Sequence, residues 1–137
     1  MNRYLLDTNV VSELRKQRPH GGVVAWLNHQ QEDQLFLSAV TMGELQEGIE
    51  RARRQDPSKA SGIESWTDRL ATSYQILPMD TPCFREWGRI MDRKPDRLLE
   101  DAMIAATARV HQLIVATRNE ADFKQLDVRI LNPFKSS

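Results

Sequence analysis

The chain has 137 residues, enough for a sizeable core, and we expect residues 1–137 to form a single domain. Its 19 basic and 19 acidic residues balance, which argues against a protein that grips long nucleic acid by bulk electrostatics. The single cysteine excludes an intramolecular disulfide and a cysteine-rich zinc site. We see no targeting signal and no membrane-spanning run, so we expect a cytoplasmic protein with no membrane partner.

Short apolar runs alternate with helical patterns along the chain. Strands are expected at 4–6, 34–38, 75–80, 113–117 and 128–131, and helices at 23–30, 40–54, 59–74, from about 80, and at 98–108. This alternation predicts an α/β fold of three layers, in which helices flank a central parallel sheet of four to five strands. The helices at 40–54 and 59–74 follow each other directly and are expected to form a helical hairpin.

Acidic residues follow the expected strand ends. Asp7 comes directly after the first strand, Glu44 lies in the first turns of the helix after the second, and Asp122 lies just after the strand at 113–117. Each also has an ordinary structural interpretation. Asp7 can cap a helix, Thr41 and Glu44 fit a capping box, and Asp122 falls in a turn that Asn119 can cap.

Asp101 stands out because it lies on the apolar face of the helix at 98–108, for which Asp96 is the expected cap. It shares that face with Ile104, Ala105 and Ala108. A carboxylate in such surroundings is costly unless a partner compensates its desolvation. Asp101 is therefore a candidate for a functional role, and the adjacent Glu100 is a weaker one.

The carboxyl ends of parallel strands meet at one edge of a sheet, so we expect Asp7, Glu44, Asp101 and Asp122 to converge there. Packed together, these acids would raise one another's pKa values unless a cation joined them. Oxygen ligands without thiolates favour Mg²⁺ or Mn²⁺, and the chemistry that follows is phosphodiester hydrolysis. The hydroxyls of Thr8 and Thr117 are expected to orient the carboxylates, and we place Asn9 with them.

Arginines repeat every four residues along the helix that begins near residue 80. Arg85, Arg89 and Arg93 would form one stripe beside the apolar positions Phe84 and Trp87. A run of like charges is more favourable next to a polyanion, so this stripe is a candidate RNA contact. Arg118, next to the expected acidic site, is another.

Four segments together resemble the signature of PIN-domain nucleases, and their order and the chain length are closest to VapC-type toxins of bacterial toxin–antitoxin pairs. The segments are Leu5-Leu6-Asp7-Thr8-Asn9-Val10, Gly43-Glu44-Leu45, Glu100-Asp101-Ala102-Met103-Ile104-Ala105-Ala106-Thr107-Ala108 and Thr117-Arg118-Asn119-Glu120-Ala121-Asp122-Phe123. The resemblance implies an endoribonuclease that depends on Mg²⁺ or Mn²⁺ and acts on structured RNA, often transfer RNA. It also implies that Asp7 and Asp101 bind the metal directly, while Glu44 and Asp122 complete the site directly or through water.

The resemblance further implies a homodimer, for which the hairpin is the expected surface, and a small VapB-like antitoxin through which the pair binds its own promoter DNA. Two alternatives stay open: a PIN nuclease of RNA processing that is not a toxin, and a non-catalytic module whose acidic pocket receives a basic peptide. A phosphoacceptor receiver or phosphatase is a third, but it would need paired acids on the first strand or a lysine at a late strand end. Thr117 is followed by Arg118 instead.

Overall fold

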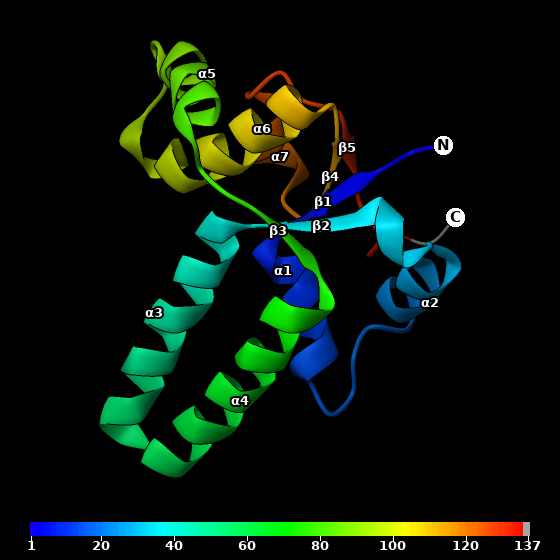
Figure 1. Cartoon of the computed structure of the whole chain (residues 1–137), viewed down its shortest axis with the longest axis vertical. Helices are drawn as coiled ribbons and strands as arrows, with labels where there is room; N and C mark the ends of the chain where they lie inside the picture. The colour runs from blue at the N-terminus through cyan, green and yellow to red at the C-terminus, as the bar shows by residue number, and fades with distance from the viewer. Residues whose placement is uncertain (136–137) are drawn as a thin grey trace.

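The strand β1 (Tyr4–Leu6) forms the centre of a five-stranded parallel sheet. In the computed structural model, which describes residues 1–135, the strand order is β3-β2-β1-β4-β5 (Figure 1). Tyr4 lies opposite Leu35 on one side and Ile114 on the other. The remaining strands are β2 (Leu35–Ser38), β3 (Gln75–Leu77), β4 (Ile114–Ala116) and β5 (Ile130–Leu131). The prediction of a parallel sheet of four to five strands is confirmed.

Helices cover both faces of the sheet. They are α1 (Thr8–Val11), α2 (Gly21–His29), α3 (Ala39–Gln55), α4 (Pro57–Ser73), α5 (Thr81–Met91), α6 (Leu99–His111) and α7 (Glu120–Lys124), with short 3₁₀ helices at Ser12–Arg15, Glu32–Gln34 and Asp96–Leu98. Successive side chains of a strand point to opposite faces of the sheet, so alternate strand residues belong to two separate hydrophobic cores, one on each face. Leu5 and Val115 pack with α6 and α7, whereas Leu6 and Leu37 pack with α1 and α2.

The expected caps of two helices, α3 and α6, differ in the structure. The helix α3 begins at Ala39, earlier than expected, and Ser38 caps it by accepting a hydrogen bond from the Val40 N–H. Thr41 is therefore fully buried inside the helix, and the capping box with Glu44 is wrong. Asp96 begins a 3₁₀ turn, and α6 starts at Leu99 with no side-chain cap.

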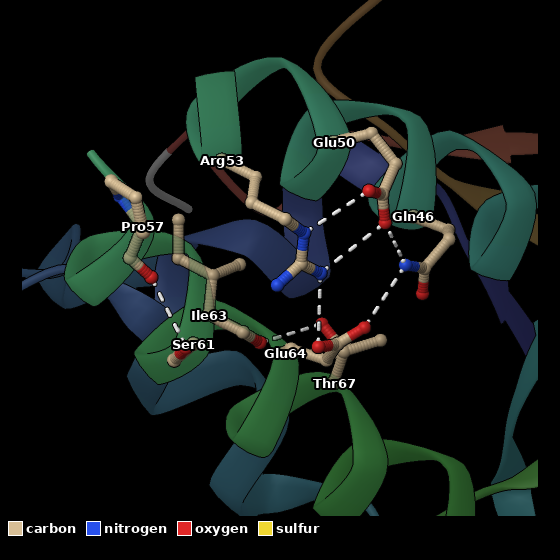
Figure 2. A network of polar contacts seen from close by, with 8 residues as sticks. All are labelled: Gln46, Glu50, Arg53, Pro57, Ser61, Ile63, Glu64 and Thr67. Carbon is tan, nitrogen blue, oxygen red and sulfur yellow. Dashed lines mark hydrogen bonds and ion pairs between the residues drawn. The ribbon is translucent and has the colours of Figure 1, made fainter. Parts of the chain in front are cut away.

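The helices α3 and α4 form the expected hairpin, which projects from one edge of the sheet (Figure 1). Figure 2 shows the polar network that joins them: Arg53 of α3 donates to Glu64 of α4 at 3.0 Å, and Gln46 donates to both Glu50 and Glu64. These side chains are well exposed, so solvent weakens their ion pairs. Arg53 thus lies between Glu50 and Glu64 and offsets their repulsion, while Ile49, Ala60 and Leu70 are among the buried apolar side chains of the hairpin.

The helix α6 is terminated by a residue with left-handed backbone geometry. Gln112 has φ 58° and ψ 47°, and its neighbour Leu113 donates to the carbonyl of Ala108 at 2.8 Å. Glycine adopts this geometry without the steric cost of a Cβ atom. We therefore expect Gln112→Gly to raise the free energy of unfolding by about 0.5–1 kcal/mol, measured by urea unfolding. An unchanged or lower value would show that Gln112 is not strained there.

Among residues 1–135, no helix combines the length and apolar character that crossing a membrane requires.

Candidate active site

Four acidic side chains meet at the carboxyl edge of the central strands, as the sequence predicts. Asp7 follows β1, Glu44 lies in the second turn of α3 after β2, and Asp122 lies in α7 after β4. Asp101 arrives from the first turn of α6. Asp7 and Asp122 both raise the pKa of Asp101, and Asp7 raises the pKa of Glu44, so the four carboxyls share one electrostatic environment.

Asp7 is the most buried member of the group, with 5% of its surface exposed. It caps α1 as expected, because its Oδ1 accepts from the Thr8 N–H at 2.8 Å. Its Oδ2 accepts from the Thr117 hydroxyl at 2.7 Å and from Asn9 Nδ2 at 3.2 Å. Burial raises the pKa of Asp7, and these three donors partly oppose the increase. The helix cap and the buried site therefore use different oxygens of one carboxyl.

Glu44 points toward α1 rather than capping α3. Its Oε1 accepts from the Thr8 hydroxyl at 2.9 Å, and that hydroxyl also lies 3.2 Å from Thr41 Oγ1. The pKa of Glu44 is raised to about 7. Burial is the largest cause, the hydrogen bond from Thr8 opposes it, and the nearby Glu100 adds to the increase. Glu100, the weaker candidate, thus lies beside the four acids and adds to their mutual repulsion.

Asp101 is half-buried, and its pKa is raised to about 6. Burial is the largest cause, followed by the charges of Asp7, Asp122 and Glu100. Asp122 behaves in the opposite way, because Arg97 pairs with it at 2.8 Å and Asn119 donates to it at 2.9 Å. These contacts lower the pKa of Asp122. Among residues 1–135, Asp122 therefore has an ion-pair partner, whereas Asp7 and Asp101 form no ion pair. The charge of Arg97 nevertheless lowers the pKa of Asp101 slightly against the larger effects that raise it.

The donor set at this edge suits a hard divalent cation. Three of its four carboxyls, those of Asp7, Glu44 and Asp101, have raised pKa values, and a cation would relieve the repulsion among them. Among residues 1–135, no three His, Cys, Asp or Glu side chains are placed to hold one ion together. Two direct carboxylate ligands with water in the other positions are compatible with this arrangement and are usual for Mg²⁺.

The candidate RNA contacts do not form a single stripe. Arg93 falls beyond the end of α5 with φ 64°, so it does not continue the stripe of Arg85 and Arg89, and the prediction of a three-arginine stripe is wrong. Arg89 pairs with Glu86 at 3.0 Å. Arg118 lies over the Phe134 ring, 4.9 Å from its centroid. The apolar face of α5 also differs from expectation, because Cys83 is buried while Phe84 is 45% exposed.

Sequence reasoning missed two polar residues beside the acids. Arg97 and Asn119 both bond to Asp122, although the sequence predicts Asn119 only as a helix cap and gives Arg97 no role. The structure shows no side-chain cap from Asn119 on α7. The position of Asn119 directly after a strand end, like that of Asn9 after β1, was the available signal.

Thr117 organises the buried side of the site. Its hydroxyl donates to Asp7 and accepts from the Asn119 N–H at 2.9 Å. We expect Thr117→Val to lower the free energy of unfolding by about 1–3 kcal/mol in metal-free buffer, because buried polar partners lose their hydrogen bonds. Urea unfolding measures this, and Thr117→Ser, which keeps the hydroxyl, is the control. Equal stability of the valine and serine variants would contradict the assignment.

This parallel sheet with an acidic edge is the fold and site of a known class of domains. The family model described as "PIN domain" matches residues 4–129. The chain therefore belongs to the PIN domain family.

Relatives with assigned names cover nearly the whole chain. "Toxin FitB" of Neisseria gonorrhoeae is 36% identical, over 95% of this chain and 97% of its own. "VapC ribonuclease Y4jK" of Sinorhizobium fredii is 33% identical, over 96% of this chain and 97% of its own. Among solved structures, FitAcB from Neisseria gonorrhoeae contains a chain that superposes with a TM-score of 0.84 at 33% identity, covering 97% of this chain and 99% of that one.

Proposed function

We propose that the protein is an endoribonuclease that uses Mg²⁺ or Mn²⁺ and acts as the toxin of a toxin–antitoxin pair. The observation that carries the proposal is the convergence of Asp7, Glu44, Asp101 and Asp122 at one sheet edge of a PIN domain. A relative named as a toxin supports the toxin role, and a relative named as a ribonuclease supports the RNA-cleaving activity; each is matched over at least 95% of this chain.

In this proposal Asp7 and Asp101 hold the cation directly, and Glu44 and Asp122 act directly or through water. When bound, the cation would lower the pKa of a coordinated water and neutralise charge on the phosphodiester. Thr117 and Asn9 hold the carboxylate of Asp7 in one orientation. In the metal-free chain the pKa of Glu44 is about 7, and a bound cation would lower it, so that Glu44 would be ionised beside the metal.

The proposed protein partner is a small VapB-like antitoxin. Solved relatives include "Structure of FitAB bound to IR36 DNA fragment", which superposes with a TM-score of 0.84 at 31% identity. We propose that this chain likewise pairs with an antitoxin and reaches promoter DNA only through it. The acidic edge has the charge that would attract a basic segment of such a partner.

We also propose a cytoplasmic homodimer that cleaves structured RNA, with transfer RNA as the first substrate to test. The exposed apolar side chains of Phe84 and Leu99 lie on α5 and α6 rather than on the hairpin that we expected to form the dimer. Light scattering of the wild type and of Phe84→Ser would test this surface. If the Phe84→Ser variant is still a dimer, the hairpin of α3 and α4 becomes the proposed dimer surface.

The decisive experiment is incubation of total bacterial transfer RNA with the purified protein in Mg²⁺, in Mn²⁺ and in EDTA. We expect discrete fragments with either metal and none with EDTA. Fragments in EDTA would contradict the metal requirement. If the protein inhibits growth and substitution of any of the four acids leaves that inhibition intact, the nuclease proposal is wrong. The protein would then be the non-catalytic binding module.

A further inference from the structure

Asn119 places its side-chain amide between two of the four acids. Its Nδ2 lies 2.9 Å from Asp122 Oδ2 and 3.3 Å from Asp101 Oδ2. A primary amide has two N–H groups, so it can donate to both carboxylates at once. Asp101 belongs to α6 and Asp122 to α7, so one uncharged group joins acids from two helices.

The carboxylate of Asp101 depends on this contact. Among residues 1–135, Asn119 is the one residue that donates a hydrogen bond to it. Asp122, in contrast, also has Arg97, which reaches its other oxygen, Oδ1, at 2.8 Å. Loss of the Asn119 amide would therefore leave Asp122 with a partner but would leave Asp101 without one.

The backbone of Asn119 is tied to the third acid. Its N–H donates to Thr117 Oγ1 at 2.9 Å, and the Thr117 hydroxyl donates to Asp7 Oδ2 at 2.7 Å. One connected path thus runs from Asp7 to Asp101, made of the two hydrogen bonds at Thr117, the covalent frame of Asn119 and the hydrogen bond from its side-chain amide to Asp101. It sets the position of the Asp101 carboxylate relative to that of Asp7.

We propose that Asn119 is a positioning residue that orients Asp101 toward Asp7 for a shared divalent cation. The inference rests on the proposed function for the identity of that cation. An amide suits this role because it donates hydrogen bonds without adding charge, so the carboxylates it holds keep their full attraction for a cation. A lysine or arginine at this place would compete with the metal instead.

The test is Mn²⁺ binding to the full chain, measured by calorimetry. We expect Asn119→Ala and Asn119→Leu to weaken Mn²⁺ binding by about 10- to 100-fold, the usual effect of removing an outer hydrogen-bond partner from a metal site. The leucine side chain has the same branching and is no smaller than that of asparagine, so a loss in both variants is not due to a cavity. With RNA substrate at saturating Mn²⁺, kcat should fall in both variants while KM stays unchanged.

The matched control is Asn132→Ala, which removes a similar amide-to-carboxylate contact, 3.2 Å from Asn132 Nδ2 to Glu120 Oε2, outside the four acids. It should bind Mn²⁺ as the wild type does. Wild-type Mn²⁺ affinity in the folded Asn119 variants would overturn the inference, and so would a wild-type chain that binds no Mn²⁺. A wild type that binds Mn²⁺ in an Asn119-dependent way but cleaves no RNA would support this inference while the nuclease proposal fails.

Discussion

Asp7→Asn and Asp101→Asn are each expected to lower metal-dependent RNA cleavage by more than about 100-fold. Even outer-shell partners of a metal typically contribute about 10- to 100-fold, and these two carboxyls are the proposed direct ligands. Each substitution keeps the side-chain shape but removes a negative charge that a divalent cation requires. Initial rates of fragment formation from transfer RNA, at a fixed Mn²⁺ concentration, measure the effect.

The control for these variants is Asp68→Asn, an exposed aspartate on α4. It should cleave at the wild-type rate. Cleavage that persists in both active-site variants would point to a contaminating nuclease and remove the role assigned to Asp7 and Asp101. Stability provides a second check, because Asp101→Asn removes a carboxylate that the fold disfavours and should not lower Tm in EDTA at neutral pH.

In metal-free buffer the protein is expected to lose stability as the pH rises from about 4 to about 7. The pKa of Asp101 is raised from 3.8 to about 6, and that of Glu44 from 4.5 to about 7, so the folded state binds protons more tightly than the unfolded chain. Where the folded state holds more protons, increasing pH favours unfolding. The loss should be complete above the folded pKa values.

Divalent metal should reverse this loss. At about 100 times its dissociation constant, Mn²⁺ adds about 2.7 kcal/mol, which corresponds to a Tm increase on the order of 10 °C. The increase should be large at about pH 7.5 and small at about pH 5, where protons occupy the same carboxyls. Thermal unfolding by circular dichroism with Mn²⁺ and with EDTA measures it. Asp101→Asn should flatten both the pH and the metal dependence, and an equal Mn²⁺ effect at both pH values would contradict the assignment.

The fold could be predicted from local patterns because the three central strands, β1, β2 and β4, are short, mostly apolar and buried on both faces. The residues 4–6 were expected as a central strand and form β1 with all three side chains buried. Helix ends were predicted less well, since several polar residues competed for each cap. Ser38 caps α3 in place of Thr41, and α6 begins without the expected cap at Asp96.

For the site, the amino-acid sequence was enough to identify the four acids, because each follows a strand end or lies on an apolar helix face. It also predicted that the hydroxyls of Thr8 and Thr117 orient carboxylates, and the structure shows them bonded to Glu44 and Asp7. Only the folded chain decided how the charges are partnered. Arg97 and Asp122 are 25 residues apart and Asn119 and Asp101 are 18 apart, so local spacing carried no sign of these contacts. These contacts depend on how α6 and α7 pack beside the sheet. The sequence therefore predicts a cluster of acids, but it does not predict that Asp122 is the acid that pairs with an arginine.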